Sequence, residues 1–201
     1  MPSRNIVKSY NTNTFYHVYN RGAGGAYIFK DAMDKHVFVN YLRRYATPRD
    51  YRDESEVQYP EYDIEVNAYC VMGNHFHLLL YIRSDTDALS GYMRSVSTAY
   101  SMYYNKKYKS RGHVFQSIFK AVAIGTDTYF AHITRYIHMN PRTYMTYKWS
   151  SLPAYLGEPH EDWLSPERAM TMTPTEYRRF IDEYTDKKKE FGYIKHLLAD
   201  A

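Results

Sequence analysis

Two histidines one residue apart, in the stretch GNHFHLLLY over residues 73–81, have the types and spacing that most directly indicate chemistry. In a β-strand, residues i and i+2 point to the same side, so His75 and His77 are expected to project together from one face. Neighbouring imidazoles repel each other when protonated, whereas a divalent metal ion accepts both as neutral ligands. The pattern supports a metal site and a pair of structural histidines about equally.

A metal site needs further ligands, and one segment supplies candidates. Residues 127–140 read as a helix in which His132, Tyr136 and Asn140 follow one another at intervals of four, so they share one face. An apolar stripe beside them would orient the helix on a sheet: Phe130, Ile133 and Ile137. Asn140 could then offer an amide oxygen, with Tyr136 one turn away. Spacing alone favours a simpler interpretation, in which Asn140 and Pro141 end the helix and Tyr136 only packs.

The chemistry of such a group of residues is coherent. Tyrosine has a pKa near 10 and attacks poorly at pH 7 unless its target is polarised. A metal ion held by two histidines and an amide oxygen keeps open positions for a phosphate and acts as a Lewis acid. Nitrogen and oxygen ligands without thiolate favour Mg²⁺ or Mn²⁺. Attack by Tyr136 would give a phosphotyrosine that retains the bond energy for strand transfer.

Bulk composition restricts the protein class. The 201 residues, 44% hydrophobic and 24% charged, fit one globular domain with a short C-terminal appendage. We find no apolar run long enough to span a membrane and no apolar signal core, which predicts a cytoplasmic protein. The single cysteine, Cys70, lies in an apolar run and is interpreted as a core thiol. A net charge of +4 and 24 tyrosines favour single-stranded nucleic acid as a partner.

The order of predicted elements indicates an α+β fold. Strand and helix patterns alternate as β (14–22), α (30–46), ββ (64–83, a hairpin or one bent strand), α (85–108), β (112–124) and α (127–140), with a loop over 47–63. This βαββαβ order is typical of a central antiparallel sheet with helices on one face. Residues 160–201 read as a helical tail with a capping box at Thr173 and Glu176, and DKKKE (186–190) as a solvated helix end.

These motifs together resemble the single-tyrosine HUH transposases, particularly the REP-associated tyrosine transposases. The resemblance runs from Phe15 to Gly157 and is carried by FYHVYNRG, VMGNHFHLLL, the segment ending GHVFQSIFKA, YIHMNP and WSSLPAYLG. It implies an RRM-like, ferredoxin-like sandwich with the histidines on a central strand. It also implies a transposase domain over 1–158 and a helical extension over 159–201. The chain departs from the family pattern in lacking a glycine-containing turn after Asn140-Pro141.

The resemblance also implies roles for individual residues. His75 and His77 would be metal ligands, Tyr136 the nucleophile and Asn140 the third ligand. Relatives nick single-stranded DNA beside short hairpins and form a 5′-phosphotyrosine link. The tyrosines Tyr103, Tyr104 and Tyr108 are rival nucleophiles, and His138 is interpreted as structural or as a DNA contact. Whether the protein acts as a monomer or as a homodimer stays open.

Basic residues predict where DNA would be held. The stretch NKKYKSRGH, over residues 105–113, mixes cations with an aromatic ring, a pattern that suits phosphates and bases and equally suits a solvated loop. The candidate nucleic-acid contacts are Arg21, Lys106, Lys107, Tyr108, Lys109, Arg111, His113, Lys120 and Arg142.

Three alternative functions remain at this stage. A metal-dependent hydrolase would normally show further acidic or histidine ligands close to the pair, whereas three leucines follow it here. An RRM-like binding module would stack bases on aromatic residues, but the KGFGFVxF-like signature is missing from the sequence. The third is a domesticated transposase that binds DNA and no longer cuts it.

Overall fold

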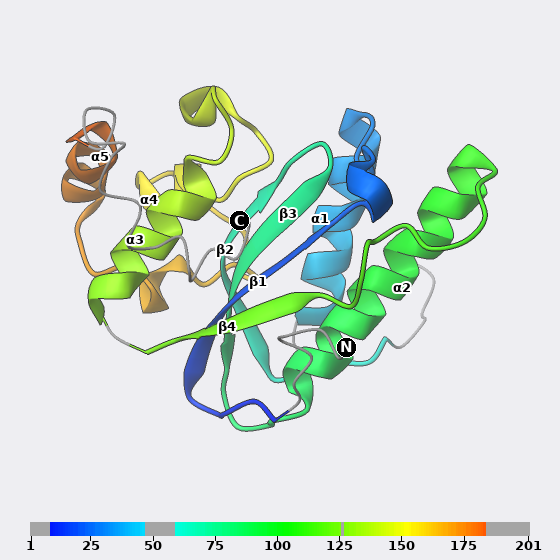
Figure 1. Ribbon diagram of the computed structural model, residues 1–201. Helices are drawn as coiled ribbons and strands as arrows, with labels where there is room; N and C mark the ends of the chain where they lie inside the picture. The colour runs from blue at the N-terminus through cyan, green and yellow to red at the C-terminus, as the bar shows by residue number, and fades with distance from the viewer. Residues whose placement is uncertain (1–8, 47–58, 126, 184–201) are drawn as a thin grey trace.

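The computed structural model describes residues 9–46, 59–125 and 127–183 as one sheet with helices on both faces (Figure 1). Within these residues the sheet has four antiparallel strands in the order β2-β3-β1-β4. The strands are β1 (Thr14–Arg21), β2 (Ile64–Val71), β3 (His75–Ile82) and β4 (Lys120–Ile124). The longer helices are α1 (Ala32–Ala46), α2 (Ala88–Tyr108) and α3 (Asp127–His138). This order confirms the predicted βαββαβ arrangement.

The two central strands place the histidine pair in the middle of the sheet. β2 and β3 form a hairpin, because the backbone N–H of Met72 donates to the carbonyl of His75 at 2.8 Å. β3 also pairs with β1, in a register that sets Tyr19 opposite His77 and Arg21 opposite His75. The predicted double strand over 64–83 is therefore a hairpin, not one bent strand.

One face of the sheet packs against α1 and α2. The even positions of β3 (Phe76, Leu78, Leu80 and Ile82) are fully buried there. They meet Phe38 and Leu42 of α1 and a stripe on α2 formed by Leu89, Tyr92, Met93, Val96 and Tyr100. A strand buries alternate residues on one face, so this set alone already forms a complete core.

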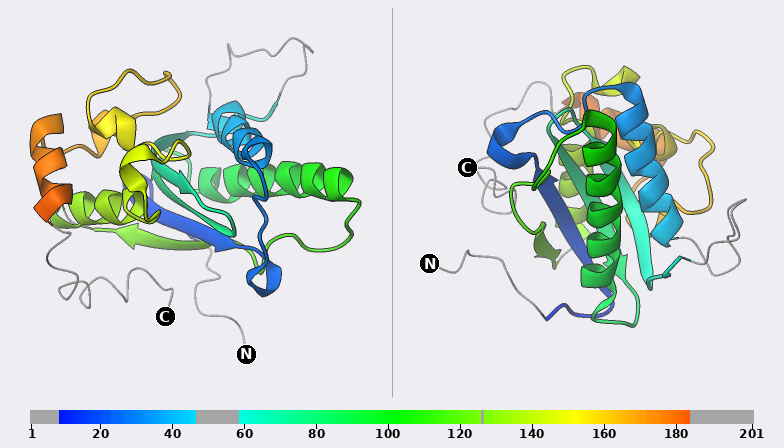
Figure 2. Two further views of the ribbon diagram at one scale, coloured as in Figure 1. Left: turned by 90° about the horizontal axis from the view of Figure 1, so that it is seen from above. Right: turned by 90° about the vertical axis from the view of Figure 1, so that its right-hand side faces the viewer.

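The opposite face is covered by α3 and by the segments that follow it, as the two views of Figure 2 show. Leu79 and Tyr81 of β3 pack here with Ile133 and Ile137 of α3. The prediction that the helices lie on one face was therefore wrong. The physical reason is that the odd positions of β3 are also apolar beyond the histidines, and exposing that face to water would cost free energy.

The helical C-terminal tail predicted from the sequence is present and packs on this second face. After α3 the chain forms α4 (Leu152–Tyr155), α5 (Pro174–Asp182) and 3₁₀ turns at Tyr144–Thr146 and Pro166–Arg168. One more 3₁₀ turn, Ala23–Gly25, follows β1. The capping box of α5 is present between Thr173 and Glu176. Tyr177 and Ile181 of α5 are buried in the second core. The DKKKE stretch lies outside the described residues, and none of the described helices is both long and apolar enough to cross a membrane.

The predicted strand over 112–124 is shorter than expected. Regular pairing with β1 begins only at Lys120, and residues 112–119 form an irregular segment beside the end of β1. Two backbone hydrogen bonds hold it there, from Ala23 to Val114 at 3.0 Å and from Gln116 to Arg21 at 2.8 Å. This segment borders two of the three cavities described below.

Candidate active site

His75 and His77 project from β3 toward the face that carries α3. His77 is 1% exposed, and His75 is half-buried at the edge of a cleft of about 240 Å³. Burial, with His17 and His75 close by, holds the pKa of His77 well below its usual range. His77 is therefore neutral at physiological pH, the state in which an imidazole can bind a metal ion.

His17, on β1, fixes the orientation of His77. Nε2 of His17 and Nδ1 of His77 share a hydrogen bond of 3.0 Å, and the two rings stack with centroids 5.2 Å apart. Nε2 of His77 is buried and has no hydrogen-bond partner among the described residues. In metal-binding histidines, one ring nitrogen usually binds the ion and the other is held by a hydrogen bond to a neighbouring group.

α3 brings Tyr136 and Asn140 to the same place. The amide oxygen Oδ1 of Asn140 lies 2.9 Å from Nε2 of His75. The ring of Tyr136 meets that of His77 edge-on, with centroids 5.2 Å apart. Ile133 and Ile137 are buried against the sheet, so they set the rotation of α3 that turns Tyr136 toward β3. His132, although on the same helical face, instead bonds to Arg135 at 2.9 Å.

The donor atoms fit a divalent ion. Each ring nitrogen of His75 faces an amide oxygen: Nδ1 lies 2.6 Å from Oδ1 of Asn74, and Nε2 lies 2.9 Å from Oδ1 of Asn140. A neutral imidazole carries one N–H and can donate to only one of these oxygens. An ion between Nε2 and Oδ1 of Asn140 would satisfy the second pair. Two ligands at right angles on an octahedral Mg²⁺ lie roughly 2.9 Å apart, because each bond is about 2.0–2.1 Å.

The amide of Asn140 is the candidate for a third donor. Throughout the described part of the chain, histidine, cysteine and acidic side chains do not gather in groups of three that could hold an ion. Nε2 of His75, Nε2 of His77 and Oδ1 of Asn140 therefore form the candidate ligand set. Nitrogen and amide oxygen without thiolate match Mg²⁺ or Mn²⁺.

Two of the predicted DNA contacts line the cleft. Arg21 is exposed at its rim and bonds through Nε to Oε1 of Gln116. Lys120 also lines the cleft, with its Nζ 5.4 Å from the centre of the Tyr19 ring. Arg142 is exposed shortly after α3. The cleft therefore carries positive charge beside the candidate ligands.

The remaining predicted contacts lie in the last turn of α2 and in the residues that follow it. Lys106, Lys109, Arg111 and His113 are exposed there. Lys107 and Tyr108 instead take part in an internal network, in which both donate at 2.7 Å to the fully buried carboxylate of Asp34. Burial and the hydrogen bond to Asp34 raise the pKa of Tyr108 to about 12.

The rival tyrosines and His138 have structural positions. Tyr103 donates to Asp34 at 3.0 Å, and Tyr104 is buried on the α2 face, so both lie on the side of the sheet away from the histidine pair. His138 is fully buried between the hydroxyls of Tyr177 and Ser151, each 2.8 Å away. Burial lowers the pKa of His138 to about 3, so this side chain is neutral and is enclosed in the core.

The sequence prediction missed His17. A signal was present, because Phe15, His17, Tyr19 and Arg21 alternate along the first strand and so share a face. Only the pairing of β1 with β3 places that face beside the histidine pair. Cys70 is buried as predicted, and burial raises the pKa of its thiol.

One family model matches this chain, and two solved structures can be compared with it. The family model described as "Transposase IS200 like" matches residues 39–140, which is half of the chain. A solved REP-associated tyrosine transposase bound to a REP hairpin is similar in fold, with a TM-score of 0.55 and 16% identity over 81% of this chain and 94% of that chain. A putative transposase from Deinococcus radiodurans R1 gives a TM-score of 0.41 and 17% identity over 68% and 95%. A search of curated proteins found no match.

Proposed function

Because this chain belongs to the family of IS200-like transposases, we propose that it cuts single-stranded DNA beside a hairpin and carries the cut end on Tyr136. The cut would depend on a divalent metal ion, Mg²⁺ or Mn²⁺. The same tyrosine would then pass the DNA end to another strand. The REP-associated relative is the model for the hairpin, since that protein was solved with a REP hairpin bound.

One observation carries this proposal. β3 and α3 are far apart in the sequence, yet they place Asn140 2.9 Å from His75 and the ring of Tyr136 5.2 Å from that of His77. A core of satisfied histidines would not leave Nε2 of His77 buried without a partner among the described residues. A metal ion beside a tyrosine accounts for both facts.

The residues of the chain have separable tasks. His75, His77 and Asn140 would hold the ion, and a bound ion would withdraw electron density from the scissile phosphate. His17 keeps Nδ1 of His77 occupied, so that only Nε2 is directed to the site. Arg21 and Lys120 would bind the flanking phosphates in the cleft.

Tyr136 would perform the covalent step. Its phenolic oxygen loses its proton and forms a bond to phosphorus, while the bond from phosphorus to the 3′-oxygen breaks. The leaving oxygen gains a proton and becomes a free 3′-OH, and the 5′-phosphate stays on Tyr136. Attack by a different 3′-OH reverses these changes and completes strand transfer. Tyr136 lies beside the histidines of its own chain, which supports cleavage in cis.

Covalent capture tests this proposal. We would incubate the protein and Mn²⁺ with end-labelled hairpin-bearing single strands from the DNA that flanks its gene, and separate the products on a denaturing gel. The expected result is a labelled protein band for the wild type that disappears in Tyr136→Phe. Tyr103→Phe is the matched control, because Tyr103 lies on the opposite side of the sheet and should retain the band.

Other results would change the assignment. A band that survives Tyr136→Phe and disappears in Tyr103→Phe moves the nucleophile to α2. Tight binding with no band on any hairpin strand favours a protein that binds DNA without cutting it.

A further inference from the structure

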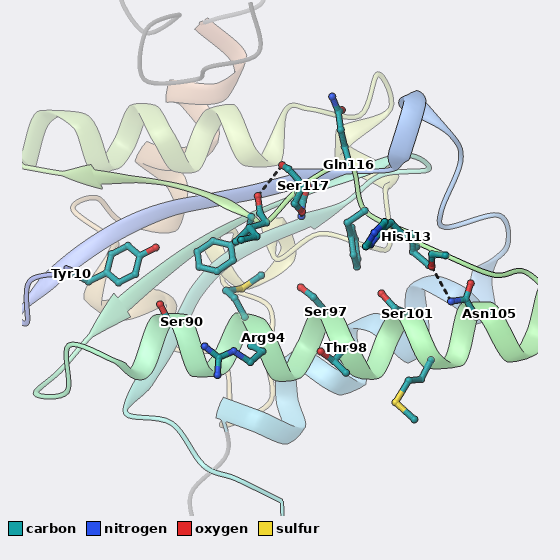
Figure 3. A pocket seen from close by; sticks show the side chains of 18 residues that line it. Tyr10, Ser90, Arg94, Ser97, Thr98, Ser101, Asn105, His113, Gln116 and Ser117 are labelled. Carbon is teal, nitrogen blue, oxygen red and sulfur yellow. Dashed lines mark hydrogen bonds between the residues drawn. The ribbon is translucent and has the colours of Figure 1, made fainter. Parts of the chain in front are cut away.

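A second and larger cavity lies on the α2 side of the sheet. It is a groove of about 780 Å³ between α2 and the irregular segment 112–119, here called the α2 groove (Figure 3). Tyr10 closes one end, and Asn105 and His113 lie at the other. Its volume is in the range of sites that bind organic ligands.

Small hydroxyl side chains create the space in this groove. Ser90, Ser97 and Ser101 project from α2 toward the segment that carries Gln116 and Ser117 (Figure 3). Intervals of seven and four residues place these serines on one helical face. A face that only packed against a neighbouring segment would be expected to carry larger apolar residues. Here the groove offers room together with hydrogen-bonding groups.

Apolar side chains line the other side of the groove. Phe115 is buried in its wall, and Phe119 is half-buried beside it. Met102 and Ile118, which also line it, are 69% and 68% exposed, among the most exposed large apolar side chains in the described residues. Flat apolar surface next to hydroxyl and amide groups matches the two parts of a nucleobase, its stacking face and its polar edge.

The α2 groove differs from another cavity of the molecule in the charge of its lining. Acidic side chains are missing from the lining of the α2 groove and of the active-site cleft, whereas Arg94 lines the groove and Arg21 and Lys120 line the cleft. A further cavity, of about 380 Å³, has an acidic lining formed by Glu61, Asp63, Glu65, Asp85 and Asp162. A polyanion would therefore be repelled from that cavity and accepted by the groove and the cleft.

The groove and the cleft share part of their lining. Asn20, Gln116 and Ser117 line both cavities, so they meet where segment 112–119 passes the end of β1. At the far end, the exposed cations Lys109 and Arg111 follow α2. A DNA strand that leaves the cleft over Gln116 and Ser117 would therefore reach the α2 groove.

We infer that the α2 groove binds unpaired bases of the single-stranded DNA whose phosphate lies at Tyr136. This inference rests on the proposed function for the position of the scissile phosphate, and the groove itself can be tested by binding alone. The bases would stack on Phe119 and Ile118, with Ser97 and Ser101 at their polar edges. The groove would then select which unpaired sequence next to a hairpin is cut.

Tryptophan substitutions that fill the groove test this inference. We would measure fluorescence anisotropy with two labelled probes, a DNA hairpin with a ten-nucleotide unpaired extension and the same hairpin without it. Ser97→Trp and Ser101→Trp should each weaken binding of the extended probe by at least about tenfold, the size of one lost stacking contact, and leave the short probe within about twofold. Thr175→Trp, an exposed position on α5, is the matched control.

Two further measurements keep the result clear. Mn²⁺ binding and thermal unfolding should match the wild type in both groove variants, which shows that the active site and the fold are intact. An extension carrying 4-thiothymidine should crosslink to peptides from residues 97–119. If folded variants bind the extended probe as the wild type does, or the crosslinks lie elsewhere, the inference is wrong. Tighter groove-dependent binding of an RNA extension would also overturn it.

Discussion

At the scale of single residues, the arrangement around His77 would present a neutral imidazole to the proposed ion. The ring is buried and hydrogen-bonded through Nδ1 to His17, and its Nε2 has no hydrogen-bond partner among the described residues. Partners of this kind typically change metal affinity by about 10–100-fold. His17 is therefore expected to position His77 without itself contacting DNA.

This expectation gives a first prediction. His17→Ala should weaken Mn²⁺ binding by about 10–100-fold, because His77 loses the partner that fixes its ring. His17→Gln, which retains a hydrogen-bond acceptor, should recover most of that loss. Titration followed by the electron paramagnetic resonance signal of free Mn²⁺ measures both, with the exposed His160→Ala as control. Unchanged affinity in His17→Ala would contradict the role given to His17.

A second prediction concerns acid stability. The pKa of His138 is about 3 in the folded protein and near 6.5 when unfolded, so below pH 6.5 the unfolded chain binds a proton that the folded chain does not. Stability is therefore full above pH 6.5 and falls as the pH drops toward 3. At pH 5 the contribution of His138 amounts to a loss of about 2 kcal/mol relative to pH 7.

Urea unfolding at pH 7 and at pH 5 checks this value. The wild type should lose about 2 kcal/mol more between the two pH values than His138→Gln, which carries no titrating group at that position. Equal losses in the two proteins would show that His138 is not the origin of the acid sensitivity.

At the scale of elements, α1 and α2 are joined by a network centred on Asp34. This fully buried carboxylate accepts hydrogen bonds from Tyr103 at 3.0 Å and from Lys107 and Tyr108 at 2.7 Å each. It also accepts from the backbone of Lys30, at the start of α1, at 2.8 Å. These bonds lower the pKa of Asp34 despite the opposing effect of burial, so the group stays charged.

Removing the Asp34 carboxylate should lower the stability of the fold and leave metal binding unchanged. Asp34→Ala leaves buried donors without an acceptor and should lower the free energy of unfolding by roughly 2 kcal/mol or more. Because Asp34 is on the α2 side of the sheet, Mn²⁺ binding at the opposite face should stay at the wild-type value. Urea denaturation and an Mn²⁺ titration test the two halves of this prediction. A parallel loss of metal binding would show that the two faces are coupled.

The order of elements could be predicted from the sequence, whereas the second face of the sheet could not. Periodicity identified the helices over 30–46, 85–108 and 127–140 to within a few residues. Non-local pairing decides what periodicity cannot show, namely that β1 lies beside β3 and that α3 packs opposite α1 and α2. The position of His17 beside His77 depends on the first of these facts, and the approach of α3 to the histidine pair depends on the second.

The irregular segment 112–119 is a second feature that could not be predicted without knowing the non-local pairing. Its composition is that of a strand, and a β-strand was predicted from residue 112. It bonds to the end of β1 through isolated backbone contacts and pairs regularly only from Lys120. Residues with high strand propensity form a regular strand only where another strand lies beside them. Residues 112–119 lack such a regular partner.

At the scale of the whole molecule, charge is distributed unevenly. The net charge is only +4, but the acidic lining of one cavity lies apart from the cleft and the α2 groove, whose linings lack acidic side chains. A modest overall charge can therefore still produce a directed interaction with DNA.

Salt dependence tests this distribution. The logarithm of the affinity for single-stranded DNA should fall linearly with the logarithm of salt concentration, and each lost phosphate contact should reduce the slope by about 0.7. Arg21→Gln should show that reduction, because Arg21 is exposed at the rim of the cleft. Arg178→Gln, on the exposed side of α5, should leave the slope unchanged. An unchanged slope in Arg21→Gln would remove Arg21 from the DNA path.

The central claim is that Tyr136 becomes covalently attached to DNA. Trypsin cuts after Arg135 and Arg142, so the peptide YIHMNPR (136–142) contains a single tyrosine. We would trap the Mn²⁺-dependent adduct, digest its DNA with nuclease and its protein with trypsin, and analyse the peptides by mass spectrometry. The account predicts a nucleotide-bearing phosphotyrosine in this peptide. The same modification on a peptide from α2, with residues 136–142 unmodified, would contradict it.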